Sequence, residues 1–162
     1  MQPDGMGPAI QDFYEENSAW CYGCGRLNED GHHFRTRWDG SETLTLYTPR
    51  AEHTAIPGFV YGGLIASLLD CHSTGSAALA LYRRDGHEPG DAAPPPRCMT
   101  ASLHVDYHRP TPLGPTLEVR GTIVEMGQRK VVVQSTLSVG GIVCASSQVV
   151  AVAAKPELLN QR

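Results

Sequence analysis

Hydrophobic positions in the middle of the chain recur at the spacing of a helix. Between about residues 63 and 82 the apolar side chains, beginning with Leu64 and Leu68, follow a helical period. Arg83 and Arg84 come at the end of this segment, where cations complement the negative end of the helix dipole. The pattern predicts one long helix that is apolar enough to be buried on nearly all sides.

The segments on both sides of this helix show the spacing of strands. The stretches "HHFRTRWDG" and "TLTLYTP" meet near Asp39-Gly40, a strong turn signal, and predict a hairpin. After a loop rich in proline and glycine, "CMTASLHVDYHRP" alternates, with Leu103, Val105 and Tyr107 on one face.

Three further strands are expected near the C-terminus. The stretches "TLEVRGTIVEMG" and "RKVVVQSTLSV" are joined by a short turn, and "IVCASSQVVAVAA" follows the turn pair Gly140-Gly141. Because their links are short, these strands should be consecutive antiparallel neighbours. The chain is therefore predicted to be an α+β protein, in which an antiparallel sheet of about five or six strands wraps around one helix. A second copy of the chain would cover the rest of the helix, so we expect a homo-oligomer.

The length of 162 residues suits one domain with a substantial core. Residues 1–20 are mostly polar, with a possible short helix at "AIQDFYEE", and we interpret them as an N-terminal extension. The domain itself is expected over 21–155, and 156–162 would form a C-terminal tail.

Composition and charge narrow the classes of function. The 13 Lys and Arg residues, against 17 Asp and Glu, form no basic run, which argues against a nucleic-acid partner. No uninterrupted apolar segment is long enough to span a bilayer, and the N-terminus lacks the pattern of a signal peptide. Five cysteines, an odd number, suggest reduced thiols. We therefore expect a cytoplasmic protein with no membrane or nucleic-acid partner.

Gly62-Gly63 opens the predicted helix, although glycine is a poor helix former. The first N–H groups of a helix have no internal partner and lie at the positive end of its dipole. Glycine lets a ligand approach this backbone closely, so the pair could form an oxyanion hole for a carbonyl oxygen that gains negative charge. The alternative is that both glycines only permit tight packing.

Asp70 interrupts the apolar helix about two turns after Gly62, roughly 11 Å along its axis. A buried carboxylate without a partner costs on the order of several kcal/mol, so its presence suggests a function. Within one chain the two groups are too far apart to act on one carbonyl, whereas across a symmetric dimer they could meet. The alternative is a packing role, with Asp70 bonded to Ser73, Thr74 or a neighbouring strand.

The segments "HTAIPGFVYGGLIASLLDCHSTGSA", "YHRPTPLG" and "GQRKVVVQSTLSVGGIVCA" together resemble the hotdog-fold acyl-CoA thioesterases, in particular the PaaI-like (phenylacetyl-CoA thioesterase-like) group. The resemblance covers about residues 21–152. Gly62, Gly63 and Asp70 match the family's glycines and carboxylate in order and spacing. The stretch "GSA" at 75–77 matches the family's small-residue tail, "RPTPLG" matches its strand-to-turn link, and "CYGCGRLNEDG" matches the N-terminal opening of a subset.

The resemblance implies a hotdog fold, assembled into a homodimer or into a homotetramer that is a dimer of dimers. It also implies hydrolysis of an acyl-CoA thioester, with coenzyme A as part of the substrate and no other cofactor. Gly62 or Gly63 would donate its N–H to the thioester oxygen, while Asp70 of the partner subunit would activate water or attack directly. Thr100 matches a position where relatives carry a Ser or Thr that helps to hold the water.

Two positions depart from the family pattern. Tyr61 stands where relatives have a histidine before the glycines; its hydroxyl can donate a hydrogen bond but takes no charge near neutral pH. Ala55 stands where some members carry an Asn or Gln that holds the water, and His53 could substitute for it. The alternative for His53 is an ordinary histidine on a surface loop.

Arg109, Arg129 and Lys130 lie near expected strand ends, where the family tends to meet the nucleotide part of coenzyme A. Arginine recognises phosphate groups well through its bidentate fork. The alternative for all three is ordinary surface charge.

Cys21-x-x-Cys24 has the spacing of half a zinc site. A second pair is missing, because the other cysteines fall on the predicted helix and strands. We therefore expect no metal, and a loop whose thiols pack against the sheet.

Two other functions compete with hydrolysis. A hotdog hydratase or dehydratase would have Pro-Gly at the helix start and a shorter spacing than that from His53 to Asp70, so the pattern argues against it. A non-catalytic protein that binds or senses acyl-CoA would use the same groove, and Tyr61 favours it. The sequence leaves open whether the acyl group is aromatic, short and branched, or of medium length.

Overall fold

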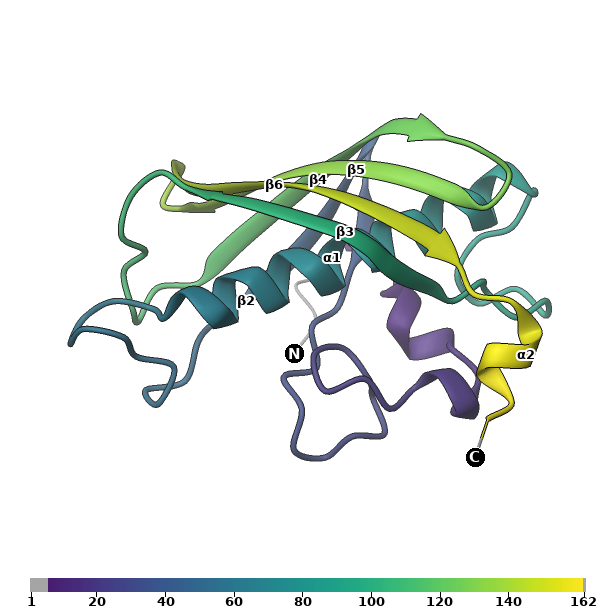
Figure 1. Ribbon diagram of the computed structural model, residues 1–162, viewed down its shortest axis with the longest axis horizontal. Helices are drawn as coiled ribbons and strands as arrows, with labels where there is room; N and C mark the ends of the chain where they lie inside the picture. The colour runs from purple at the N-terminus through teal and green to yellow at the C-terminus, as the bar shows by residue number, and fades with distance from the viewer. Residues whose placement is uncertain (1–5, 162) are drawn as a thin grey trace.

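The computed structural model, which describes residues 6–161, contains an antiparallel sheet and one long helix. The six strands follow the order β1-β2-β4-β5-β6-β3 across the sheet. They are β1 (Arg37–Asp39), β2 (Glu42–Tyr47), β3 (Cys98–Tyr107), β4 (Leu117–Met126), β5 (Lys130–Val139) and β6 (Ile142–Ala153). Helix α1 (Gly62–Arg84) lies along one face of the curved sheet (Figure 1). The predicted α+β architecture is confirmed, and β4, β5 and β6 are consecutive antiparallel neighbours as expected.

The two halves of α1 differ in burial. From Cys71 to Tyr82 every residue is buried, whereas Gly62 and Gly63 at its start are exposed. In the described part of the chain α1 is also the one helix long and apolar enough to cross a membrane by length and composition, which the sequence analysis did not anticipate. However, 83% of its most apolar window is buried inside the fold, as expected of a core helix.

The first hairpin is shorter than predicted. β1 and β2 pair around Gly40, which adopts the left-handed conformation (φ 64°) that this tight turn requires. Residues 32–36 lie outside the strand because Thr36 pairs with the N-terminal segment. The Ile10 N–H donates to the Thr36 carbonyl (2.9 Å), and the Thr36 N–H donates to Gln11 Oε1 (2.7 Å).

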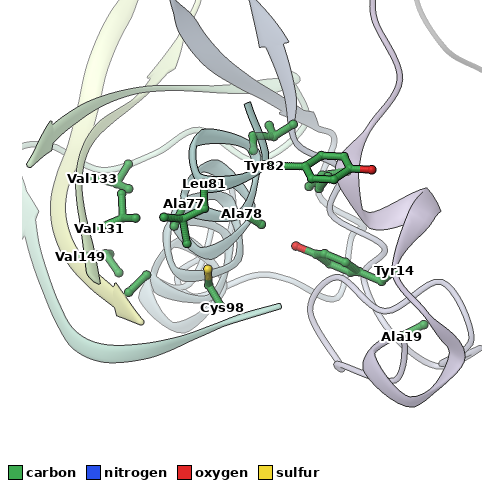
Figure 2. Packing of buried hydrophobic residues seen from close by; sticks show 13 residues of the cluster. Tyr14, Ala19, Ala77, Ala78, Leu81, Tyr82, Cys98, Val131, Val133 and Val149 are labelled. Carbon is green, nitrogen blue, oxygen red and sulfur yellow. The ribbon is translucent and has the colours of Figure 1, made fainter. Parts of the chain in front are cut away.

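The core contains side chains from the N-terminal segment as well as from α1 and the sheet. Figure 2 shows one of its two clusters, in which Ala77 and Leu81 of α1 pack with Val133 of β5. Tyr14 and Ala19 belong to the same cluster and are at most 2% exposed. They come from a segment that forms two short 3-10 helices, η1 (Ile10–Phe13) and η2 (Glu16–Ser18), and a third short helix, α2 (Pro156–Leu159), follows β6. The part of the predicted N-terminal extension that the structure describes thus contributes to the core.

β3 is an edge strand with a bulge near its beginning. Among the described residues it pairs only with β6, and the register shifts at Ala101: Thr100 lies opposite Ala151, and Ser102 opposite Val150. Side chains of a regular strand alternate between faces, so residues 100 and 107 would point in opposite directions. The extra residue reverses the alternation, and as a result Thr100 and Tyr107 both reach α1.

Candidate active site

The start of α1 offers free backbone donors to a ligand. Tyr61 is the N-cap residue, in an extended conformation, and its side chain makes no capping hydrogen bond. Gly62 and Gly63 form the first turn, in which the N–H groups have no partner inside the helix. The positive end of the helix dipole lies at the same place as these free N–H groups. Together they favour the binding of an oxygen atom that carries negative charge.

Each of the two glycines lies beside a tyrosine ring. A Cβ added to Gly63 would lie 2.5 Å from a ring carbon of Tyr61, which is too close, so this glycine permits the packing of Tyr61. A Cβ added to Gly62 would lie 3.4 Å from the Tyr107 hydroxyl oxygen, close to an ordinary contact. The Tyr107 hydroxyl donates to the Gly62 carbonyl (2.7 Å). Gly63 thus accommodates the ring of Tyr61, and Gly62 lines an open pocket.

Asp70 is half-buried and accepts a hydrogen bond from the Thr100 hydroxyl of β3. Ser73 and Thr74 do not bond it, because their hydroxyls donate to the carbonyls of Leu69 and Cys71. Burial raises the pKa of the Asp70 carboxyl above its usual value, while the bond from Thr100 opposes this shift. A carboxylate in this state is a stronger base than an exposed one.

The Asp70 carboxyl and the glycines share one face of the helix. Gly63, Ser67 and Asp70 are spaced at i, i+4 and i+7, and each is exposed or half-buried. The rest of the described chain therefore leaves these three residues at least partly exposed, whereas it buries the next three turns of α1. The arrangement leaves a base and a set of backbone donors facing the same open side, about two turns apart.

The three predicted CoA-binding cations lie at two different ends of the sheet. Arg109 lines an open pocket of about 400 Å³ together with Gly62 and Tyr107. Arg129 donates to the Ala153 carbonyl (2.6 Å) at the far end of β6. Lys130 forms a surface ion pair with Glu125 of β4, in which its Nζ lies 3.4 Å from a carboxylate oxygen. Within one chain, therefore, only Arg109 joins the glycines.

His53 is not on the surface, so the surface-loop alternative is wrong. It is only 5% exposed, and its Nδ1 accepts from the Arg50 N–H (3.0 Å). Burial and the Arg50 charge lower the pKa of His53, which favours the neutral ring. Its carbonyl accepts from the Tyr61 N–H (3.0 Å), so His53 holds the loop that leads into α1.

The roles of two residues in this region could not be predicted from the sequence. Tyr107 was expected only as one of several residues on a strand face, and its hydrogen bond to Gly62 joins β3 to α1, two elements far apart in the sequence. Cys71 was assigned to the helix alone, but its sulfur lies within 4.8 Å of those of Cys21 and Cys24. The Cys-x-x-Cys motif was a visible signal, whereas its third member comes from the tertiary fold.

The chain belongs to the thioesterase superfamily, whose family model matches residues 57–151. This range contains α1 and the strands β3 to β5, together with most of β6. Acyl-coenzyme A thioesterase THEM4 of Mus musculus is 30% identical over 95 residues, which is 59% of this chain and 35% of that protein. The chain thus spans about a third of the length of this curated relative.

Solved structures show the same fold. A thioesterase superfamily protein of Shewanella loihica PV-4 is 43% identical, with a TM-score of 0.67 over 90% of this chain and 99% of that chain. The PaaI protein of E. coli, from the phenylacetic acid degradation operon, is 13% identical, with a TM-score of 0.61 over 76% of this chain and 81% of that one. The likeness to PaaI concerns the fold alone. The expected hotdog fold and thioesterase family are confirmed.

Proposed function

We propose that the protein hydrolyses an acyl-CoA thioester to a free acid and CoA, with Asp70 as the general base. The observation that carries this proposal is the open face of α1, which presents Asp70 and the Gly62-Gly63 backbone in a chain of the thioesterase superfamily. The name of the curated relative supports coenzyme A as the thiol part of the substrate.

In the proposed reaction Asp70 takes a proton from a water molecule, and the water oxygen attacks the thioester carbonyl carbon. The N–H of Gly62 or Gly63 stabilises the resulting oxyanion. The C–S bond then breaks, and CoA leaves as a thiolate that takes the proton from Asp70, which becomes a carboxylate again. Thr100 holds one Asp70 oxygen and leaves the other free for the water. Direct attack by Asp70 to give an anhydride is the alternative; the raised pKa of the carboxyl favours the general base.

The proposed site needs two subunits, because the base and the donors of one chain are roughly 11 Å apart along the helix. In a homodimer, Asp70 of one protomer faces the glycines of its partner. The outer edge of β3 supports such a dimer, because the free edge of a ten-residue strand is normally covered. Its apolar side chains Met99, Leu103 and Tyr107 are 40–53% exposed. A dimer of dimers would extend the same assembly.

Arg109 is proposed to contact bound coenzyme A, because it is a cation that lines the pocket at Gly62. Arg129 and Lys130 would reach the nucleotide only from a neighbouring subunit, since they lie at the other end of the sheet. His53 and Tyr61 would act by shaping the loop and the helix start.

The proposed reaction needs no cofactor beyond the coenzyme A of the substrate. We place it in the cytoplasm, without a membrane or nucleic-acid partner. The five cysteines support this location because all are free thiols, as is typical of a reducing compartment.

A non-catalytic acyl-CoA-binding protein is the second candidate. It is favoured by Tyr61, whose ring lies against Gly63 where the family's histidine would stand. The Tyr61 ring crowds Gly63, and its side chain makes no capping hydrogen bond at the start of α1.

The test measures thiol release from a panel of aromatic, short branched and medium-chain acyl-CoAs. We expect turnover of at least one class, and a loss of about a hundredfold or more in kcat for Asp70→Asn. Asp106→Asn is the matched control, because Asp106 is an exposed carboxylate on β3 and should leave kcat unchanged. If no acyl-CoA reacts while one binds, the hydrolase proposal fails and the binding protein takes its place.

A further inference from the structure

Three thiols from two distant parts of the chain meet beside α1. Cys21 and Cys24 come from the loop before β1, and Cys71 comes from the helix. Their sulfur atoms all lie within 4.8 Å of one another, and those of Cys21 and Cys71 are 3.9 Å apart. Cys24 and Cys71 are buried, while Cys21 is half-buried. The other two cysteines of the chain take no part in this cluster.

The loop is folded closely around the cluster. A Cβ added to Gly23 would lie 2.3 Å from the Cys71 sulfur, and one added to Gly25 would lie 2.4 Å from the Cys21 nitrogen. The Gly25 N–H donates to the Cys21 carbonyl (2.7 Å), which closes a tight turn. Only glycine fits at these two positions, and as a result both loop thiols face the helix.

The sulfur spacing suits a bound metal ion. In a tetrahedral thiolate site with metal–sulfur bonds of about 2.3 Å, neighbouring sulfur atoms are about 3.8 Å apart. The distance between the Cys21 and Cys71 sulfurs, 3.9 Å, agrees with this value. A disulfide would require about 2.05 Å.

The charge beside the cluster also suits thiolates. The Arg97 guanidinium is half-buried, and its Nη2 lies 3.9 Å from the Cys24 sulfur. The Arg97 Cζ atom lies 5.1 Å from the centroid of the Tyr14 ring. No carboxylate oxygen of residues 6–161 lies within 4.0 Å of the guanidinium nitrogens. A half-buried cation needs a compensating charge. Three thiolates around a divalent cation have one net negative charge, which Arg97 would balance.

We propose that Cys21, Cys24 and Cys71 bind one Zn²⁺ ion. A water molecule completes the coordination on the half-buried side of Cys21, since no fourth His, Cys, Asp or Glu of the described residues joins the group. The ion fastens the N-terminal loop to α1 at the residue that directly follows Asp70. It thereby fixes the turn of the helix that bears this carboxylate, whether or not the proposed hydrolysis is correct.

The test is the metal content of the full chain, produced with zinc in the medium and purified under reducing conditions without chelator. We expect about one zinc per chain by mass spectrometry, and a loss of at least about tenfold in Cys21→Ser and Cys71→Ser. Cys144→Ser is the matched control, because Cys144 is a buried thiol outside the cluster and its variant should keep the metal.

A second measurement separates a lost ligand from a lost fold. Co²⁺ added to the metal-free wild type should give a thiolate-to-cobalt charge-transfer band, which should be absent in Cys21→Ser. Because Cys21 is half-buried and lies on a loop, the helical circular dichroism of Cys21→Ser should equal that of the wild type. The proposal is overturned if the wild type holds no zinc and gives no cobalt band. It is equally overturned if both serine variants keep the metal, or if fresh protein has a Cys21–Cys71 disulfide.

Discussion

Asp70 and His72 are polar side chains two residues apart on an apolar helix, and their surroundings differ. His72 is fully buried, with its ring nitrogens 2.8 Å from the Thr45 hydroxyl and 3.2 Å from the Thr43 hydroxyl. Asp70 is half-buried and has one hydroxyl partner, Thr100. Both ring nitrogens of His72 are therefore occupied, whereas Asp70 keeps most of its acceptor capacity free.

The comparison of Asp70 with His72 shows that a pKa shift caused by burial does not by itself identify a functional group. Burial favours the neutral form of both residues: it lowers the pKa of His72 to about 3 and raises that of Asp70. The two differ in whether a substrate or water can still reach them. We assign His72 to the stability of the fold, and Asp70 is the group that we propose for the reaction.

The largest expected effect is the loss of stability in His72→Ala. The change removes two buried hydrogen bonds and leaves a cavity, which should lower the free energy of unfolding by about 2–4 kcal/mol. Asp70→Ala should cost less than about 1 kcal/mol, because the site is partly open. Urea denaturation at one protein concentration measures both, and equal losses would contradict the assignment.

The next effect is a loss of stability in mild acid. The unfolded chain protonates His72 below pH of about 6.5, but the folded chain does so only near the lowered pKa of about 3. Because the unfolded state binds the extra proton, the contribution of His72 falls as the pH decreases, by about 2 kcal/mol between pH 7 and pH 5. Urea denaturation at the two pH values measures this difference. His72→Ala should lose correspondingly less than the wild type over the same interval; an equal loss in both would exclude His72 as the source.

The smallest expected effect concerns the partner of Asp70. Thr100→Val removes the hydrogen bond that lowers the pKa of Asp70, so this pKa should rise further and the acid limb of the pH–rate profile should move to higher pH. At neutral pH we expect a decrease in kcat of about fivefold to tenfold. Ser102→Ala, beyond the bulge, is the control, and an unshifted profile in Thr100→Val would separate Thr100 from the base.

Much of the fold could be predicted because it depends on local patterns. The apolar period of the helix, the Asp39-Gly40 turn and the short links between the last strands each act within a few residues. The bulge at Ala101 could not be predicted, since one extra residue leaves no mark in an alternating strand. Yet the Thr100 side chain reaches Asp70 because Ala101 is inserted after it.

The site was predictable where one element contains it and unpredictable where the tertiary fold assembles it. Gly62 and Asp70 lie on one helix, so their relation follows from helix geometry. The grouping of Cys71 with the loop thiols, and the separation of Arg109 from Arg129, depend on which segments the fold brings together. Ile10 and Tyr14 were read as part of a polar extension because their apolar side chains are scattered among polar ones.

The position of β6 has a consequence for how the chain is made. This strand leaves the ribosome after the other five strands of the sheet, yet it lies between β5 and β3 and is the only neighbour of β3 in the described sheet. At ~5–20 residues per second, β3 waits several seconds for its partner while the apolar α1 is already complete. During that interval a nascent chain exposes both a free strand edge and a bare helix. Molecular chaperones that bind such surfaces would protect it until β6 arrives.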